Sequence, residues 1–240
     1  MDLSKYYAQY PLKDQKPGFS EQIGYNNRLR LLKRHGIGRS HRILDYGCGA
    51  GLFVDFLRQN GFHSAQGYDP YVPSYRDGGI LKSSYDAVVS YDVIEHDDDC
   101  RAFMRRIPPL VRPGGVVVIG TPNADHVPIE RKGDPGFHPP YHRHILSERI
   151  LLALGREQGL EPVAVGRRSF YDSLIPTVNS RFLWRYLEKG LLDVVCEAPK
   201  TGLVLRSPDL LFLAFFGYFV PLRDYIMVTF RNSGQYGWRN

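Results

Sequence analysis

Glycines and a carboxylate are crowded into residues 45–51 (DYGCGAG), directly after a short apolar run. Gly47, Gly49 and Gly51 would leave the main chain bare, so that a ligand can reach free N–H groups at the start of the next helix. The spacing differs from the Gly-x-Gly-x-x-Gly fingerprint of dinucleotide sites, because the third glycine comes one position early. Asp45 would repel a pyrophosphate and attract an ammonium group. The pattern indicates a ligand that carries a cation here; the alternative is that the glycines only form a tight turn.

A second carboxylate, Asp69, follows the apolar residues 65–68. An acidic side chain at the end of the second strand can accept hydrogen bonds from both hydroxyls of a ribose. The alternative is a turn or cap residue before Pro70. An ammonium group together with a ribose, without phosphates, describes S-adenosylmethionine.

Predicted strands and helices alternate around these residues. Apolar runs that are separated by helices indicate a parallel sheet covered on both faces. The fold class predicted is α/β, with a Rossmann-like, doubly wound sheet. We expect helices at 21–36, 52–59 and 147–159, and strands at 42–46, 65–68, 87–91, 115–120, 162–165 and 225–231.

Residues 170–222 are too long for a plain loop and contain helix-like patches and several prolines. We predict an inserted helical cap that selects the acceptor. The domain division is then an N-terminal arm (1–24), a core (25–169 with 223–240) and the cap (170–222). The apolar run 210–222 is shorter than a spanning helix. Its aromatic side chains suit core packing or, alternatively, a pocket wall or an interfacial helix that meets a lipid-like substrate: Phe212, Phe215, Phe216, Tyr218 and Phe219.

Composition limits the classes of protein to consider. The 240 residues fit one domain or one domain with an insertion. The formal charge of +6 is spread in short clusters, which indicates a solvated surface or weak attraction to acidic partners or anionic lipid. Three cysteines do not form a disulfide framework, and no export signal is visible, so we expect a cytoplasmic protein. The tyrosines of the arm either are loose or fold over the cleft: Tyr6, Tyr7 and Tyr10.

The order of these motifs resembles the class I S-adenosylmethionine-dependent methyltransferases. The glycine turn and Asp69 match the first two motifs, and residues 90–96 (SYDVIEH) and 110–123 (LVRPGGVVVIGTPN) match the later ones. The likeness covers roughly 25–170 and 223–231 and is greatest to the branch that contains the ubiquinone-biosynthesis O-methyltransferases. It implies an antiparallel last strand and S-adenosyl-L-methionine as the cofactor.

The resemblance also implies which residues contact the cofactor. An arginine on the leading helix of that branch corresponds to Arg28 within about one position; the alternative is a plain surface arginine. Residues 71–86 are too short for the helix and strand that the fold usually has there, and Asp77 is the one acidic candidate for an adenine contact, which we leave unassigned. The expected cofactor-binding residues are Arg28, Asp45, Gly47, Cys48, Gly49, Asp69, Pro70 and Tyr91.

The resemblance also points to a divalent metal such as magnesium, manganese or zinc. The branch has Glu-x-x-Glu-His after its third strand, and this chain has Asp92, Glu95 and His96 there. Without metal, His96 could be a general base, because the ordinary pKa of histidine, about 6.5, leaves it mostly neutral at pH 7. The alternative is that residues 95–99 only begin a helix with acidic side chains.

Three further histidines, His138, His142 and His144, follow the fourth strand. His142 matches a histidine of related methyltransferases, so His96 and His142 are the catalytic candidates. A nucleic-acid acceptor is not expected, because residues 138–141 (HPPY) are misplaced for an amino-methylation motif and no cysteine follows a proline. We expect methylation of a small molecule, with oxygen as the acceptor atom; the alternatives are transfer to nitrogen or carbon, and a protein that binds the cofactor without turnover.

Overall fold

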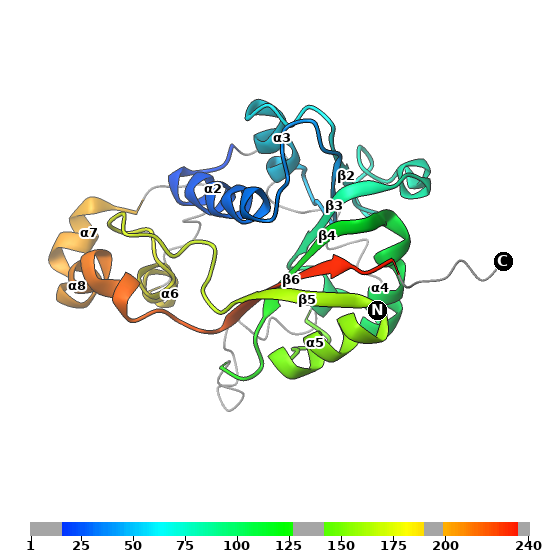
Figure 1. The fold of residues 1–240 in the computed structure, drawn as a ribbon. Coiled ribbons are helices and arrows are strands. Elements are labelled where there is room, and N and C mark those ends of the chain that lie inside the picture. The colour runs from blue at the N-terminus through cyan, green and yellow to red at the C-terminus, as the bar shows by residue number, and fades with distance from the viewer. Residues whose placement is uncertain (1–15, 127–141, 190–198, 235–240) are drawn as a thin grey trace.

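The computed structural model describes residues 16–126, 142–189 and 199–234 (Figure 1). Its centre is a six-stranded sheet in the order β2-β1-β3-β4-β6-β5. The strands are β1 (Ile43–Tyr46), β2 (Ala65–Tyr68), β3 (Tyr85–Tyr91), β4 (Val111–Pro122), β5 (Leu160–Gly166) and β6 (Tyr225–Asn232). Strands β1 to β4 pair in parallel, and β6 is antiparallel to both β4 and β5. This arrangement confirms the predicted α/β class and its antiparallel last strand.

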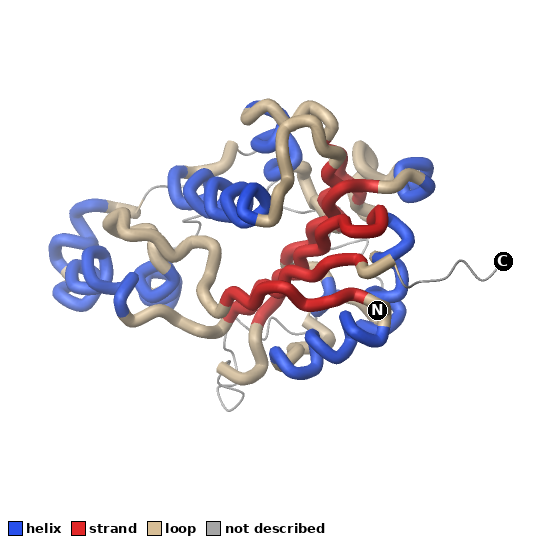
Figure 2. Tube along the Cα trace, viewed as in Figure 1, coloured by secondary structure: helices blue, strands red, loops and turns tan. Residues whose placement is uncertain are grey.

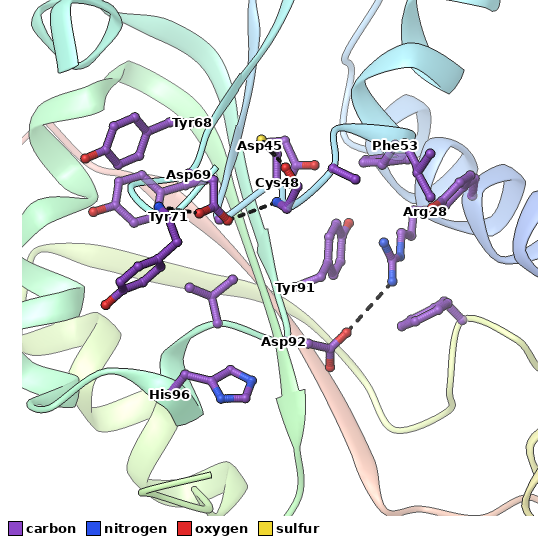
Figure 3. Close-up of a pocket in the computed structure, with 18 of the residues that line it drawn as sticks. Arg28, Asp45, Cys48, Phe53, Tyr68, Asp69, Tyr71, Tyr91, Asp92 and His96 are labelled. Atoms are coloured by element: carbon purple, nitrogen blue, oxygen red, sulfur yellow. Dashed lines mark hydrogen bonds and ion pairs between the residues drawn. The ribbon is translucent and has the colours of Figure 1, made fainter. Parts of the chain in front are cut away.

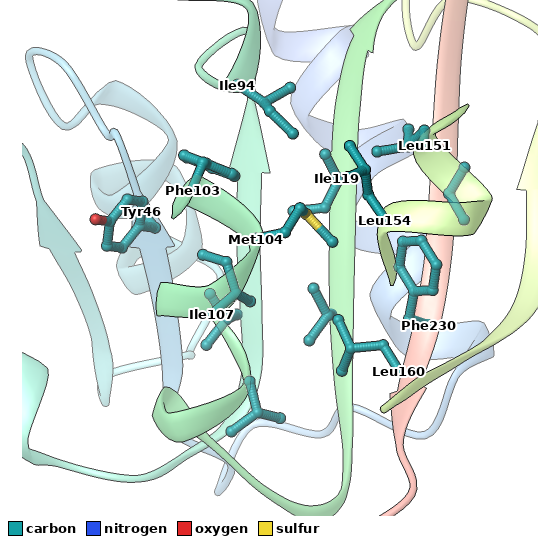
Figure 4. Close-up of a cluster of buried hydrophobic side chains, with 14 of the residues drawn as sticks. Tyr46, Ile94, Phe103, Met104, Ile107, Ile119, Leu151, Leu154, Leu160 and Phe230 are labelled. Carbon is teal, nitrogen blue, oxygen red and sulfur yellow. The ribbon is translucent and has the colours of Figure 1, made fainter. Parts of the chain in front are cut away.

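Helices cover both faces of the sheet (Figures 1 and 2). One face packs against α2 (Phe19–Arg34) and α3 (Leu52–Gln59), and the other against α4 (Cys100–Arg106) and α5 (Glu148–Glu157). Successive strand residues point to opposite faces, so Val88 belongs to one cluster and Val89 to the other. Figure 4 shows the cluster beneath α4 and α5, where Phe103, Met104 and Leu151 are fully buried. Burial of this apolar surface on both sides fixes the strands whose ends carry the site.

The unit between β2 and β3 is short, as the length of residues 71–86 predicted. It contains the 3₁₀ helix η1 (Gly78–Lys82), and β2 is therefore an edge strand. Asp77 caps η1, where its side chain accepts a hydrogen bond from the N–H of Gly79. Strand β4 is longer than predicted: Val111 already pairs with Tyr85 of β3 before an irregularity in the register, and the strand continues to Pro122, which pairs with Tyr225 of β6.

The insert forms a group of helices beside the sheet (Figure 1). These are α6 (Ser180–Glu188), α7 (Thr201–Arg206), α8 (Pro208–Phe216) and η4 (Gly217–Phe219). The group has a small core of its own, which includes Phe182, Tyr186 and Leu210. Core packing is the wrong prediction for four of the aromatic residues, whose side chains are exposed: Phe212, Phe215, Phe216 and Phe219. Within the described residues, no helix is long and apolar enough to cross a membrane.

Candidate functional site

The glycine turn connects β1 to α3 through backbone conformations that L side chains rarely adopt. Gly47, Gly49 and Gly51 have φ values of 85°, 53° and 79°. A Cβ atom at Gly47 would overlap the methyl groups of Val93, and one at Gly51 would overlap the ring of Tyr75. The turn therefore requires glycine for both conformation and space.

Asp69 joins the end of β2 to this turn. Its side chain is 5% exposed, and its two oxygens accept hydrogen bonds from the N–H of Gly49 at 3.0 Å and of Tyr71 at 2.9 Å. Burial raises the pKa of the carboxyl, and the backbone N–H groups of Tyr71, Gly49 and Val72 oppose that rise. Each carboxylate oxygen retains a lone pair beyond these bonds, which a ribose hydroxyl can use.

Asp45 is buried at the end of β1. Burial is the main cause that raises its pKa to about 7, the charge of Arg28 opposes the rise, and Asp69 adds to it. Near neutral pH the carboxyl therefore lies close to its midpoint, and an ammonium group placed beside it would favour the ionised form.

Arg28 lies on α2 and is buried, so the alternative of a plain surface arginine is wrong. Its guanidinium carbon lies 3.7 Å from the ring centroid of Phe170 and 4.3 Å from that of Tyr91, and one nitrogen is 3.9 Å from a carboxylate oxygen of Asp92. The Nε atom has no hydrogen-bond partner in the described part of the chain. A buried guanidinium with an unused donor suits an anionic group such as the carboxylate of an amino acid.

One cavity of about 810 Å³ collects the predicted cofactor residues (Figure 3). Asp92, His96 and His142 also contribute to its wall, whereas Glu95 lies buried behind it. The predicted residues in the wall are Arg28, Asp45, Gly47, Cys48, Gly49, Asp69, Pro70 and Tyr91. Burial and the charge of Asp45 raise the pKa of the Cys48 thiol far above its usual value, so this thiol is neutral and is a packing contact.

Glu95, His96 and His142 form a cluster at one side of the cavity. Their ligand atoms lie within 4.8 Å of one another. One oxygen of Glu95 accepts a hydrogen bond from the hydroxyl of Thr121 at 2.9 Å, and the other has no partner in the described residues. Burial raises the pKa of this carboxyl well above its usual value. The backbone carbonyl of Glu95 accepts the N–H of Arg143 at 2.8 Å, and this contact brings His142 to His96.

Asp92 is held apart from this cluster. Only residues 94–96 (η2) form a helical turn, and Asp92 precedes it with a φ of 56°. Figure 3 shows its carboxylate directed at Arg28, with His96 on the other side. The predicted set of Asp92, Glu95 and His96 therefore differs from the set that the fold brings together. Of the acidic residues 97–99, Asp99 does begin a helix, because its side chain caps α4.

Other wall residues carry no local sequence signal. Phe170 and Tyr171 follow β5, and Tyr225 begins β6. The hydroxyl of Tyr171 donates a hydrogen bond to Glu21 of α2, and the side-chain amide of Asn27 donates to the carbonyl of Phe170 at 2.8 Å. These contacts join α2 to the start of the insert over the cavity.

The remaining candidates lie elsewhere. The Nε2 atom of His144 is 3.2 Å from the carbonyl oxygen of Asp98, and His144 does not line the cavity. Asp77 is likewise absent from its wall. His138 and the arm tyrosines, Tyr6, Tyr7 and Tyr10, fall outside the described residues.

Comparison with known proteins finds relatives that share this core. Residues 19–165 match the family described as "Methyltransferase domain". A ubiquinone biosynthesis O-methyltransferase from Caulobacter sp. (strain K31) is 29% identical over 120 residues, which are 40% of this chain and 48% of that protein. One from Azorhizobium caulinodans is 30% identical over 103 residues, which are 34% of this chain and 40% of that protein. The matches therefore span less than half the length of these curated relatives.

Solved structures share the fold at low sequence identity. The N-methyltransferase NodS from Bradyrhizobium japonicum, in complex with S-adenosyl-L-homocysteine, matches with a TM-score of 0.50 and 16% identity over 96% of each chain. An S-adenosylmethionine-dependent methyltransferase from Archaeoglobus fulgidus matches with a TM-score of 0.52 and 15% identity, over 89% of this chain and 95% of that chain. Since the family model covers more than half of the sequence, the chain belongs to the methyltransferase-domain family, among the class I S-adenosylmethionine-dependent methyltransferases.

Proposed function

We propose that this protein transfers the methyl group of S-adenosylmethionine to an oxygen atom of a small molecule. The observation that carries the proposal is one cavity with two chemically different sides. Asp45, Asp69 and Arg28 supply partners for an ammonium group, a ribose and a carboxylate on one side. His96 and His142 supply bases on the other.

Methyl transfer is a displacement in line with the carbon–sulfur bond of the sulfonium. A lone pair of the acceptor oxygen forms the new bond to carbon, the old bond breaks, and its electron pair stays on sulfur to give S-adenosylhomocysteine. The acceptor proton must leave, and the imidazole of His96 or His142 can take it. The rings lie 4.8 Å apart between centroids, so a second nitrogen base is close to the first.

Transfer to nitrogen is the second candidate, because an uncharged amine attacks without a base. The names of the curated relatives favour oxygen, and the cluster that includes His96 also favours an acceptor that must lose a proton. Binding of the cofactor without turnover is a third possibility, which a direct test of product formation distinguishes.

A divalent metal fits the cluster of Glu95, His96 and His142. The oxygen of Glu95 that lacks a partner in the described chain is buried, and two imidazoles stand beside it. Carboxylate and imidazole together suit magnesium, manganese or zinc. When bound, such an ion would lower the pKa of an acceptor hydroxyl and orient it. Asp92 would have to leave Arg28 to join these ligands.

The test is formation of S-adenosylhomocysteine by the full chain with S-adenosylmethionine and three acceptors: a catechol, a simple phenol and an amine. Product with the catechol or phenol supports the proposal, and product with the amine alone overturns the choice of oxygen. Binding of the cofactor without product from any acceptor would favour the non-catalytic alternative. Binding of NAD in place of S-adenosylmethionine would refute the whole assignment.

His96→Ala should slow turnover by about 100-fold or more, whether the imidazole is a base or a ligand. His144→Ala is the matched control, since His144 lies outside the cavity wall. A chelator separates the two roles, because it should abolish turnover of the unmodified protein only if a metal is used. Full activity of His96→Ala in the presence of chelator would remove the cluster from the chemistry.

A further inference from the structure

Helix α8 is apolar on two opposite faces. Leu210 and Ala214, four residues apart, are buried in the core of the cap. Phe212, Phe215 and Phe216 project from the other side and are 57%, 56% and 52% exposed. A surface helix normally presents polar side chains there, so α8 has an apolar face with no cover in the described structure.

The apolar face continues beyond the helix. Phe219 in η4 is 66% exposed and Val220 is 48% exposed. The rings of Phe212 and Phe216 stack with centroids 5.2 Å apart. We call these five residues the phenylalanine surface: Phe212, Phe215, Phe216, Phe219 and Val220. Helix α8 lies in the cap, to the side of the sheet, and none of the five residues lines the cavity (Figure 1).

Two arginines donate hydrogen bonds to the backbone at the end of this surface. The guanidinium of Arg168 donates a hydrogen bond to the carbonyl of Tyr218 at 2.9 Å and lies over its ring. Arg181 donates from Nε to the carbonyl of Val220 at 2.7 Å. Both side chains are exposed, and neither forms an ion pair within the described residues. Burial raises the pKa of the nearby Asp172 carboxyl and the charge of Arg168 opposes that rise, but the two do not form an ion pair. This end of the surface, beside Phe219, therefore carries exposed positive charge.

We infer that the phenylalanine surface docks on a bilayer that contains anionic lipids. Aromatic side chains can enter the boundary between headgroups and acyl chains while Arg168 and Arg181 contact lipid phosphates. A second copy of the chain fits less well. In a two-fold dimer the surface would meet itself, and its five apolar residues would offer no acidic side chain to the arginines at its end. A bilayer with anionic lipids provides phosphates for both arginines, neither of which forms an ion pair within the described residues.

The docking surface is connected to the cavity through the chain. Arg168 is two residues from Phe170, whose ring lines the cavity and packs on Arg28. A protein that docks by this face would hold its cavity near the membrane, where apolar acceptors dissolve. The docking itself does not depend on methyl transfer, so the two proposals can fail separately.

The test is flotation of the full chain with vesicles of phosphatidylcholine alone and with vesicles in which about one lipid in three is phosphatidylglycerol. We expect binding to the anionic vesicles and its loss at high salt. Phe215→Ser with Phe216→Ser should weaken binding at least about tenfold. Both side chains are already exposed, so the variant should fold and bind S-adenosylhomocysteine as before. The matched control is Ile150→Ser with Val163→Ser, which removes two exposed apolar side chains from α5 and β5. This variant should leave vesicle binding unchanged.

The role of the two arginines is tested by variants that remove or keep the positive charge. Arg168→Gln with Arg181→Gln should weaken binding by about fivefold for each charge removed, whereas the corresponding lysine variants should retain most of it. Equal loss in the glutamine and lysine variants would show that local structure, and not charge, is responsible, and would overturn the anionic-lipid assignment. Equal binding to the neutral and the anionic vesicles would also overturn the anionic-lipid assignment. Absence of vesicle binding, or a dimer that the phenylalanine substitutions dissociate, would refute docking on a bilayer.

Discussion

Removal of the Asp69 carboxylate should weaken binding of S-adenosylmethionine by about tenfold to 100-fold. In the structure each oxygen of Asp69 already accepts one backbone N–H, from Gly49 and Tyr71, and retains capacity for one ribose hydroxyl. Each charge-assisted hydrogen bond contributes roughly 1.5–3 kcal/mol. Water that fills the space in Asp69→Ala recovers part of this energy, so we expect a net loss of about one bond. A loss of about 1.4 kcal/mol corresponds to a tenfold change.

Isothermal titration calorimetry with S-adenosylmethionine, S-adenosylhomocysteine and adenosine measures this loss. All three ligands have the ribose, so Asp69→Ala should weaken all of them, whereas a loss confined to the first two would place the carboxylate at the amino-acid part. Asp99→Ala is the control, because Asp99 also accepts two backbone N–H groups but caps α4 outside the cavity. It should lower thermal stability without changing affinity. Unchanged affinity in Asp69→Ala would refute the ribose role.

Two further predictions concern the glycine turn. Because burial raises the pKa of Asp45 to about 7, affinity for the cofactor should fall as pH decreases below 7, and Asp45→Asn should flatten this profile in titrations across that range. The ligand-free protein should show the opposite trend in thermal unfolding: its free energy of unfolding should fall as pH rises from 3.8 to about 7, because the carboxyl ionises in the unfolded chain while burial keeps it protonated in the folded one. A flat profile in both measurements would contradict the burial. Gly47→Ala should reduce both stability and cofactor affinity, because its Cβ would overlap Val93 at a φ of 85°. Gly36→Ala has a similar φ of 88° with no atom near its Cβ, so equal stability losses in the two variants would show that backbone strain alone, without the overlap, is responsible.

The side of the cavity that we propose for the cofactor contains the residues predicted from sequence, because their signals are local. A glycine turn between a strand and a helix, and an acid at the end of the next strand, each occupy a few consecutive residues. Parallel strands then bring their carboxyl ends to one edge of the sheet. Asp45 and Asp69 lie at the ends of neighbouring strands for this reason.

The side that we propose for catalysis depends on contacts that spacing does not encode. A helical turn was needed to place Asp92 with Glu95 and His96, and the positive φ of Asp92 prevents it. His142 joins them because the segment after it hydrogen-bonds to the backbone of Glu95, a contact between distant parts of the chain.

Exposure of the aromatic cap residues was equally inaccessible to sequence reasoning. Hydrophobicity alone favours burial for Phe212, Phe215 and Phe216. A short helix that is apolar on two opposite faces can bury only the face that meets its neighbours, and the identity of those neighbours is decided by the fold.

The position of β6 between β4 and β5 has a consequence for folding during synthesis. When residues 160–166 have left the ribosome, β5 has no partner in the sheet, because β6 is made about sixty residues later and is the strand that joins it to β4. Until then β4 has an unpaired edge, and the large side chains of β4 and α5 lack Phe230, which fills the space between them. Until β6 is synthesised, the nascent protein therefore has unpaired strand edges. Such edges make incompletely folded chains prone to aggregate and to bind chaperones.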